Sequence, residues 1–242
     1  MVKKKNGIRR EVGVYNHLWR KERSWEVAST VPLNVVVGLV EDAGTPTIIL
    51  SSLQSGKQVF RLYTLTGEMR LAYTSDGSHQ GVTIGLLNIP GTQKKDIAAV
   101  YTEGSDLFLH HISLTTEARL VRRVPLPMFH LRAVGAGGNL HGDDTLTYVA
   151  AGGAGESPLL VYLNTDGTID RSFFPYTVNY RGGLQLIVAD YNHDGADDAI
   201  VGPIASPQPV RVWNDRSRKL FEWPVTFMKA QKNSSLLGIS GL

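Results

Sequence analysis

Oxygen-bearing side chains recur at short, regular intervals in the segment ADYNHDGADDAIVG, which begins at residue 189. They are Asp190, Asn192, Asp194 and Asp198. Calcium takes roughly six to eight oxygen ligands, and this spacing lets the four side chains converge together with the backbone carbonyl of Ala196. Gly195 permits the sharp turn that such a loop needs. The segment therefore predicts a Ca2+ site made by these five ligand residues.

Two other interpretations of this segment are an EF-hand loop between helices and a turn that binds no metal. Its opening D-x-N-x-D-G matches an EF-hand loop, but Val201 stands where that loop needs a bidentate glutamate. The flanking segments IVAD and DAIVG are typical of strands and not of helices. A turn rich in Asx residues that binds no metal is the simpler alternative. The spacing favours a calcium loop between two strands.

The chain repeats itself with a period near fifty residues. One landmark is an apolar segment that ends in a small residue, and its copies are spaced 47, 50, 54 and 49 residues apart. The small residues are Gly38, Gly85, Gly135, Ala189 and Gly238. A second landmark is an apolar segment running into a turn, spaced 48, 48, 51 and 51 residues apart. It is marked by Tyr15, Tyr63, His111, Tyr162 and Trp213.

Repeats of about fifty residues with several short strands each are typical of β-propeller blades. The predicted fold is all-β, a single β-propeller domain over residues 1–242 with about five four-stranded blades. The predicted blades cover residues 30–78, 79–127, 128–178, 179–228, and 229–242 together with 8–29. Pairing of residues 12–16 with 234–241 in one sheet would close the ring and remove its open edges. Because the split blade is short, a fragment of a longer propeller is the alternative.

The region from about residue 150 to residue 223 resembles the FG-GAP repeat, also called the VCBS-type repeat, of bacterial surface proteins and integrin α-subunit propellers. The resemblance rests on the loop D-x-N-x-D-G-x-x-D between two strands. It implies a propeller fold and calcium bound by the same five residues. Asp197 is not a position that the motif requires. The corresponding loops LVEDAGTP, LLNIPGTQKKD and GAGGNLHGDDT have lost length, carboxylates or spacing.

Catalytic motifs are absent from the sequence, which has no G-x-S-x-G elbow, no phosphate-binding loop and no H-E-x-x-H. His110 and His111 are expected to pack, since neighbours on a strand point to opposite faces, and the aromatic landmarks are expected to pack between blades. We therefore expect a non-enzymatic, calcium-stabilised binding or adhesion scaffold whose ligand is a glycan or a protein surface. The alternative is an enzyme or an accessory module of a carbohydrate-active enzyme, because propellers also carry such activities.

Positive charge is concentrated at the N-terminus. Residues 1–23 carry eight Lys or Arg against two Glu, and the remainder carries seventeen against twenty acidic residues. We expect residues 3–10 to form a mobile, solvated arm with at most weak affinity for polyanions, and nucleic acid is not favoured as a partner. No apolar run is long enough to span a bilayer, and no signal-peptide pattern is present. We expect a monomer outside the cell or at its surface, where calcium is millimolar.

Overall fold

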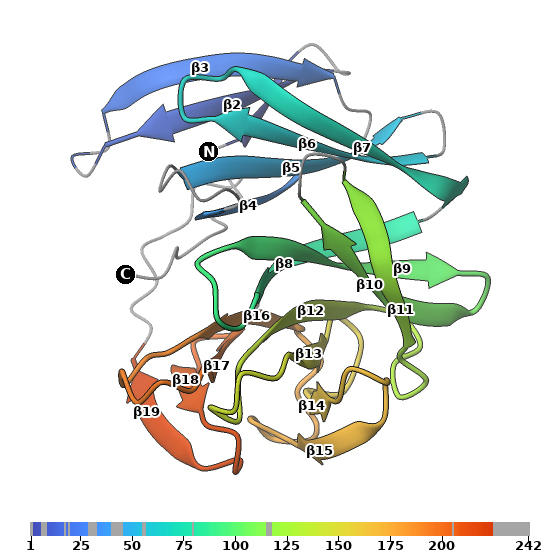
Figure 1. Ribbon diagram of the computed structural model, residues 1–242, viewed down its shortest axis with the longest axis vertical. Helices are drawn as coiled ribbons and strands as arrows, with labels where there is room; N and C mark the ends of the chain where they lie inside the picture. The colour runs from blue at the N-terminus through green and yellow to red at the C-terminus, as the bar shows by residue number, and fades with distance from the viewer. Residues whose placement is uncertain are drawn as a thin grey trace. The chain divides into compact units, whose positions relative to one another are not determined.

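The computed structural model describes residues 2–5, 9–16, 18, 20–28, 33–39, 46–54, 57–78, 80–114, 118–204 and 206–224. The regular structure in these ranges is all β-strand, so the predicted all-β class is confirmed (Figure 1). None of these residues lies in a helix long and apolar enough to cross a bilayer. The strands fall into two compact units, β1–β7 in Met1–Gln80 and β8–β19 essentially in Gly81–Thr226.

The first unit contains a three-stranded and a four-stranded antiparallel sheet. The three-stranded sheet consists of β1 (Val2–Lys5), β2 (Arg9–Tyr15) and β3 (Lys21–Ala28), in that order. The four-stranded sheet consists of β4 (Asn34–Leu39), β5 (Pro46–Gln54), β6 (Lys57–Thr64) and β7 (Met69–Ser78), in that order. Both sheets contribute to one apolar core cluster, formed by Val12, Val27, Leu33, Ile48, Leu50 and Tyr63.

The second unit contains three four-stranded antiparallel meanders. The first has β8 (Gln80–Asn88), β9 (Lys95–Glu103), β10 (Asp106–Ser113) and β11 (Arg119–Pro125). The second has β12 (Ala133–Gly138), β13 (Thr147–Gly152), β14 (Leu160–Leu163) and β15 (Ile169–Phe173). The third has β16 (Leu184–Ala189), β17 (Asp198–Pro203), β18 (Val210–Trp213) and β19 (Lys219–Trp223). In the described part of the chain, one parallel pair, Gly137 with Leu87, joins the first two meanders into one curled eight-stranded sheet.

The sequence landmarks fall on equivalent strands of the four-stranded sheets. The small residues lie on the first strands, with Gly38 on β4, Gly85 on β8, Gly135 on β12 and Ala189 on β16. The second landmarks lie on the third strands, with Tyr63 on β6, His111 on β10, Tyr162 on β14 and Trp213 on β18. Within the described residues, the fifty-residue period is therefore the period of a four-stranded meander. Gly238 lies outside the described residues.

A register shift recurs between the third and fourth strands of the β4–β7 sheet and of each meander in the second unit. It lies at Leu62 and Tyr63, at His111 and Ile112, at Tyr162 and Leu163, and at Val212 and Trp213. β2 and β3 have the same shift, between Val14 and Tyr15. These two strands therefore correspond to the third and fourth strands of a meander, and β1 corresponds to the second.

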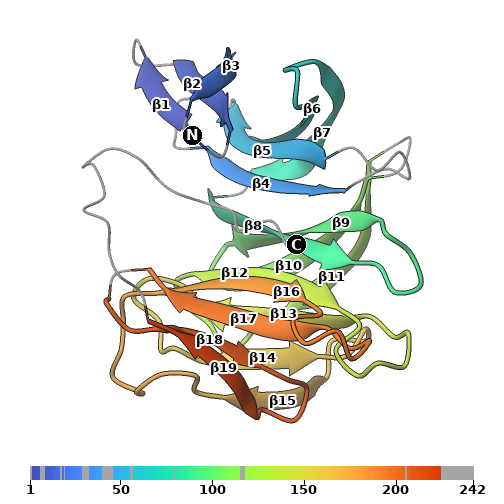
Figure 2. The same ribbon diagram turned by 90° about the vertical axis from the view of Figure 1, so that its left-hand side faces the viewer.

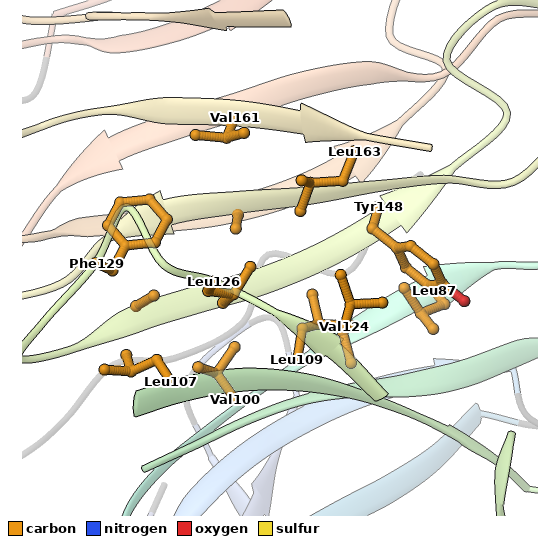
Figure 3. Close-up of a cluster of buried hydrophobic side chains, with 13 residues drawn as sticks. Leu87, Val100, Leu107, Leu109, Val124, Leu126, Phe129, Tyr148, Val161 and Leu163 are labelled. Carbon is orange, nitrogen blue, oxygen red and sulfur yellow. The ribbon is translucent and has the colours of Figure 1, made fainter. Parts of the chain in front are cut away.

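The second meander buries both of its faces, because side chains alternate along its strands. On β13 and β14, one set faces the first meander and consists of Tyr148, Ala150, Val161 and Leu163. Figure 3 shows this cluster, with Val161 and Leu163 on one side and Val100, Leu109 and Val124 on the other. The opposite set faces the third meander and consists of Val149, Ala151, Leu160 and Tyr162. The third meander is drawn in orange to red in Figure 2 and stacks on the second through this core.

The crowding between first strands explains why small residues mark them. A Cβ added to Gly85 would lie 2.0 Å from the carbonyl oxygen of Gly135, on the neighbouring first strand. A Cβ on Gly135 would lie 2.8 Å from Leu109 Cδ1. Gly85 therefore has no room for a side chain, because backbone blocks it, whereas a side chain at Gly135 would require Leu109 to move.

The N-terminus differs from the expectation of a solvated arm. Val2–Lys5 form β1 and pair with β2, with Lys3 opposite Glu11, Lys4 opposite Arg10 and Lys5 opposite Arg9. Local composition suggested solvent exposure, but a neighbouring strand edge provides backbone partners that composition does not reveal. The predicted pairing of residues 12–16 with 234–241 involves a segment outside the described residues and stays a prediction.

Candidate metal centre

The acidic loop connects two paired strands of the third meander. β16 and β17 form an antiparallel hairpin whose last pair is Ala189 with Asp198. The chain turns within the loop at His193, with φ of 59°, and at Gly195, with φ of 88°. A Cβ at Gly195 would meet nothing within 4 Å, so the positive φ and not the available space is what favours glycine there. The five expected ligand residues all lie in this hairpin.

The carboxylate of Asp190 accepts hydrogen bonds from two backbone amides of the turn. Asp194 N donates to Asp190 Oδ1 at 3.1 Å, and Gly195 N donates to Asp190 Oδ2 at 3.1 Å. Two short-range bonds of this kind hold the loop wrapped around the first carboxylate of the motif.

Asn192 and Asp194 are joined directly. Asn192 Nδ2 donates to Asp194 Oδ2 at 2.8 Å, and Asn192 Oδ1 accepts from Asp194 N at 3.1 Å. Ala196 N donates to Asp194 Oδ1 at 3.0 Å. This backbone bond and the Asn192 amide hold the pKa of the Asp194 carboxyl below its usual range, so this group stays ionised.

Asp198 is the buried member of the set, with 2% of its surface exposed. Its Oδ2 accepts from Tyr191 N at 3.3 Å. Burial raises the pKa of Asp198 to about 6, and the negative charges of Asp194 and Asp190 add to the increase. Among the described residues, no basic side chain contributes to this shift. A buried carboxylate beside two more carboxylates is an arrangement that a cation would stabilise.

The donor set fits calcium in its chemistry. Three carboxylates, one amide oxygen and a backbone carbonyl are the hard oxygen ligands that this ion takes. Across the described parts of the chain, no three His, Cys, Asp or Glu side chains are gathered closely enough to hold a metal ion. Asp190 and Asp194 are instead directed to the loop amides. If they bound a metal, their oxygens would have to turn part of the way from these amides towards the ion.

Asp197, which the motif does not require, makes the longest-range polar contacts of the loop. Asn139 N donates to Asp197 Oδ2 at 2.9 Å, and Asp197 N donates to Asn139 O at 2.8 Å. Asn88 Nδ2 donates to Asp197 Oδ1 at 3.0 Å. The Asp197 carboxylate of the third meander thus contacts both other meanders of its unit. It contacts Asn88 at the end of β8 in the first, and Asn139 just after β12 in the second.

A glycine leaves room for the Asp197 carboxylate, and a lysine lies nearby. A Cβ on Gly138 would lie 2.1 Å from Asp197 Oδ2, so a glycine is needed at that position. Lys95 Nζ donates to Asn88 Oδ1 at 2.6 Å. Burial lowers the pKa of Lys95, and the negative charge of Asp197 partly opposes this. The sequence held one indication of this network, since an asparagine ends or follows the first strand in two of the three repeats with degraded loops.

The two adjacent histidines are buried, as expected for packing residues. His111 Nε2 lies 2.8 Å from Asp96 Oδ2, and His111 Nδ1 lies 3.0 Å from Tyr148 Oη. His110 Nε2 lies 3.0 Å from Glu103 Oε1. The landmark residues Tyr63 and Tyr162 are buried too, which confirms the packing role expected for them.

His193 is exposed at the tip of the acidic loop. No protein-family model matches this chain, and no curated protein is significantly similar to it.

Proposed function

We propose that this chain is a calcium-stabilised, non-enzymatic binding scaffold of the FG-GAP or VCBS type, built as a five-bladed β-propeller. The observation that carries the calcium proposal is the buried carboxylate of Asp198 beside Asp190 and Asp194. Bound calcium would hold these carboxylates together in their ionised form. The chemistry that the ion supplies is structural, because it links the two ends of one hairpin loop.

The repeated meanders support the propeller. The β4–β7 sheet and the three meanders of the second unit have four strands each, and they share with the three-stranded sheet the shift between their last two strands. Among the described residues, the three-stranded sheet has no counterpart of a first strand. The segment 234–241 carries the first-strand landmark Gly238 in the sequence. We propose that this segment completes the fifth sheet and closes the ring.

The proposed ligand is a glycan or a protein surface, bound by loops at one face of the ring, and the proposed setting is outside the cell or at its surface. Loops on a rigid scaffold are the usual carriers of such binding. A site of this type in extracellular modules binds calcium at roughly 10⁻⁴–10⁻³ M, which suits a structural ion in a millimolar calcium environment.

Calorimetric titration of the folded chain with CaCl2 tests the metal proposal. We expect one site, with Kd near 10⁻⁴–10⁻³ M, and we expect Asp194→Ala to abolish calcium uptake. Asp166→Ala is the matched control, because Asp166 lies in another Asx turn and accepts from Thr168 only locally. Absence of uptake at several millimolar calcium would contradict the proposal.

Glycan-array binding with and without a chelator tests the ligand proposal. We expect calcium removal to weaken binding by loosening the 190–198 loop. Turnover of a glycan or ester substrate, lost on substitution of an acidic residue, would favour the enzymatic alternative instead.

A further inference from the structure

We propose that Asp197 is a positioning residue that couples the acidic loop to the first and second meanders of its unit, so that calcium bound in the loop also stabilises the β8–β9 and β12–β13 hairpins. This inference rests on the proposed calcium function. It assigns a role to a side chain that lies beside the ligand set and outside the motif.

The first step is the reciprocal contact between Asp197 and Asn139. Their two backbone amides both donate across the interface, one to a carbonyl and the other to the carboxylate. Asn139 Nδ2 also lies 3.5 Å from the carbonyl oxygen of Gly195. The turn of the acidic loop is therefore held against the loop that follows β12.

The second step is the bridge through Asn88. Its amide nitrogen donates to Asp197 Oδ1 and to the carbonyl oxygen of Val188, each at 3.0 Å. Asn88 is the last residue of β8, as Ala189 is of β16. An aspartate at position 88 would offer only acceptors to these two oxygens. The Asn88 amide thus supplies the donor that both of these oxygens need.

The third step is the place of Asp197 in the chain. It lies between Ala196 and Asp198, two of the expected ligand residues. Successive side chains near a strand start point to opposite faces. The Asp198 side chain therefore points into the acidic loop, where it accepts from Tyr191 N, while the Asp197 side chain contacts the neighbouring meanders. A displacement of Asp197 must move the ligands on both sides of it.

Linkage makes the coupling reciprocal. If the Asp197 contacts hold the loop in the form that binds calcium, then calcium must strengthen those contacts by the same factor. Two backbone amides in the β8–β9 turn, which belongs to a different meander, can be used to measure this coupling. Ile89 N donates to Lys94 O and Thr92 N donates to Ile89 O, each at 3.2 Å. Their opening is a local event that hydrogen exchange measures.

The experiment measures calcium affinity by calorimetry and amide hydrogen exchange with and without calcium, for the wild type, Asp197→Ala, Asn88→Ala and Asp166→Ala. In the wild type and in Asp166→Ala, we expect calcium to slow the exchange of Ile89 and Thr92 by about tenfold. In Asp197→Ala and Asn88→Ala, we expect calcium to bind about tenfold more weakly. When these two variants are saturated with calcium, the exchange of the two amides should no longer respond to it.

A residue with only a structural role would speed exchange equally with and without calcium. An unchanged calcium effect on these amides in both variants would therefore overturn the proposal for Asp197 while calcium binding itself stands. Absence of calcium uptake by the wild-type protein would overturn the proposed function together with this inference. Asn88→Ala keeps the chain of the acidic loop intact, so it provides the answer if Asp197→Ala does not fold.

Discussion

The ring of Tyr191 meets the ring of Trp223 edge-on, with centroids 5.2 Å apart and an interplanar angle of 87°. Tyr191 stands between two expected calcium ligands, whereas Trp223 lies on β19 at the edge of the same meander. Phe221 packs against both rings, at 5.8 Å and 5.1 Å. The acidic loop therefore touches an aromatic cluster that reports on its conformation.

We expect calcium to change the fluorescence of Trp223, because turning the carboxylates towards a metal shifts the backbone that carries Tyr191. Titration with CaCl2 under tryptophan excitation measures this change. Trp223→Phe should remove it, and Trp25→Phe, in the other unit, should keep it. A calcium response that survives Trp223→Phe would show that the aromatic cluster is not the reporter.

We expect part of the protein's alkaline instability to come from Tyr148. Burial raises its pKa to about 12, with a smaller increase from Asp96 and an opposing effect of Arg122. An unfolded tyrosine ionises near 10, so the stability that the neutral folded phenol provides is complete below that pH and falls as the pH rises towards 12.

Urea unfolding at pH 8 and pH 11 measures this effect. We expect the wild type to lose about 1.4 kcal/mol more than Tyr148→Phe between these two values. At pH 8 the variant should be about 1 kcal/mol less stable, because it loses the contact with His111. Equal losses in both proteins would contradict the assignment.

We expect Gly138→Ala to destabilise the protein by about 1–3 kcal/mol, because the new methyl group would overlap the Asp197 carboxylate. The cost should be smaller in an Asp197→Ala background, and chemical unfolding of the four proteins in the cycle measures the difference. Gly202→Ala is the control, since its Cβ would lie 3.3 Å from Val210 Cγ2. Strict additivity of the Gly138 and Asp197 substitutions would argue against this contact.

We expect deletion of residues 1–5 to lower the free energy of unfolding by about 1–2 kcal/mol, since β2 would lose β1, one of its two partner strands. The control is the double substitution Lys4→Thr and Lys5→Thr, which keeps the strand and removes like charges opposite Arg10 and Arg9. This variant should be as stable as the wild type or slightly more so. Thermal unfolding without change after the deletion would favour the solvated arm instead.

Repetition and local patterns predicted much of this structure. The period placed equivalent residues on equivalent strands. Each four-stranded repeat has a small residue on its first strand and the second landmark residue on its third strand. The acidic loop was likewise predicted between two strands, since its glycine and its flanking β-branched runs are local features.

Contacts between distant segments were harder to predict. Asp197 joins residues that are 58 and 109 positions away in the chain, and no local pattern records such partners. β1 was missed for a similar reason, because three successive lysines suggest solvent until the neighbouring strand is known.

The recurring shift between third and fourth strands has a consequence for the behaviour of the protein at high concentration. The fourth strands β3, β7, β11, β15 and β19 end their sheets, each with one edge that no described strand pairs. An exposed, regular edge is a template for pairing with another chain. The irregular register, together with exposed charges such as those of Arg119, Arg122 and Arg123 on β11, makes each outer edge a poor template. We therefore expect these outer edges to disfavour β-pairing between molecules.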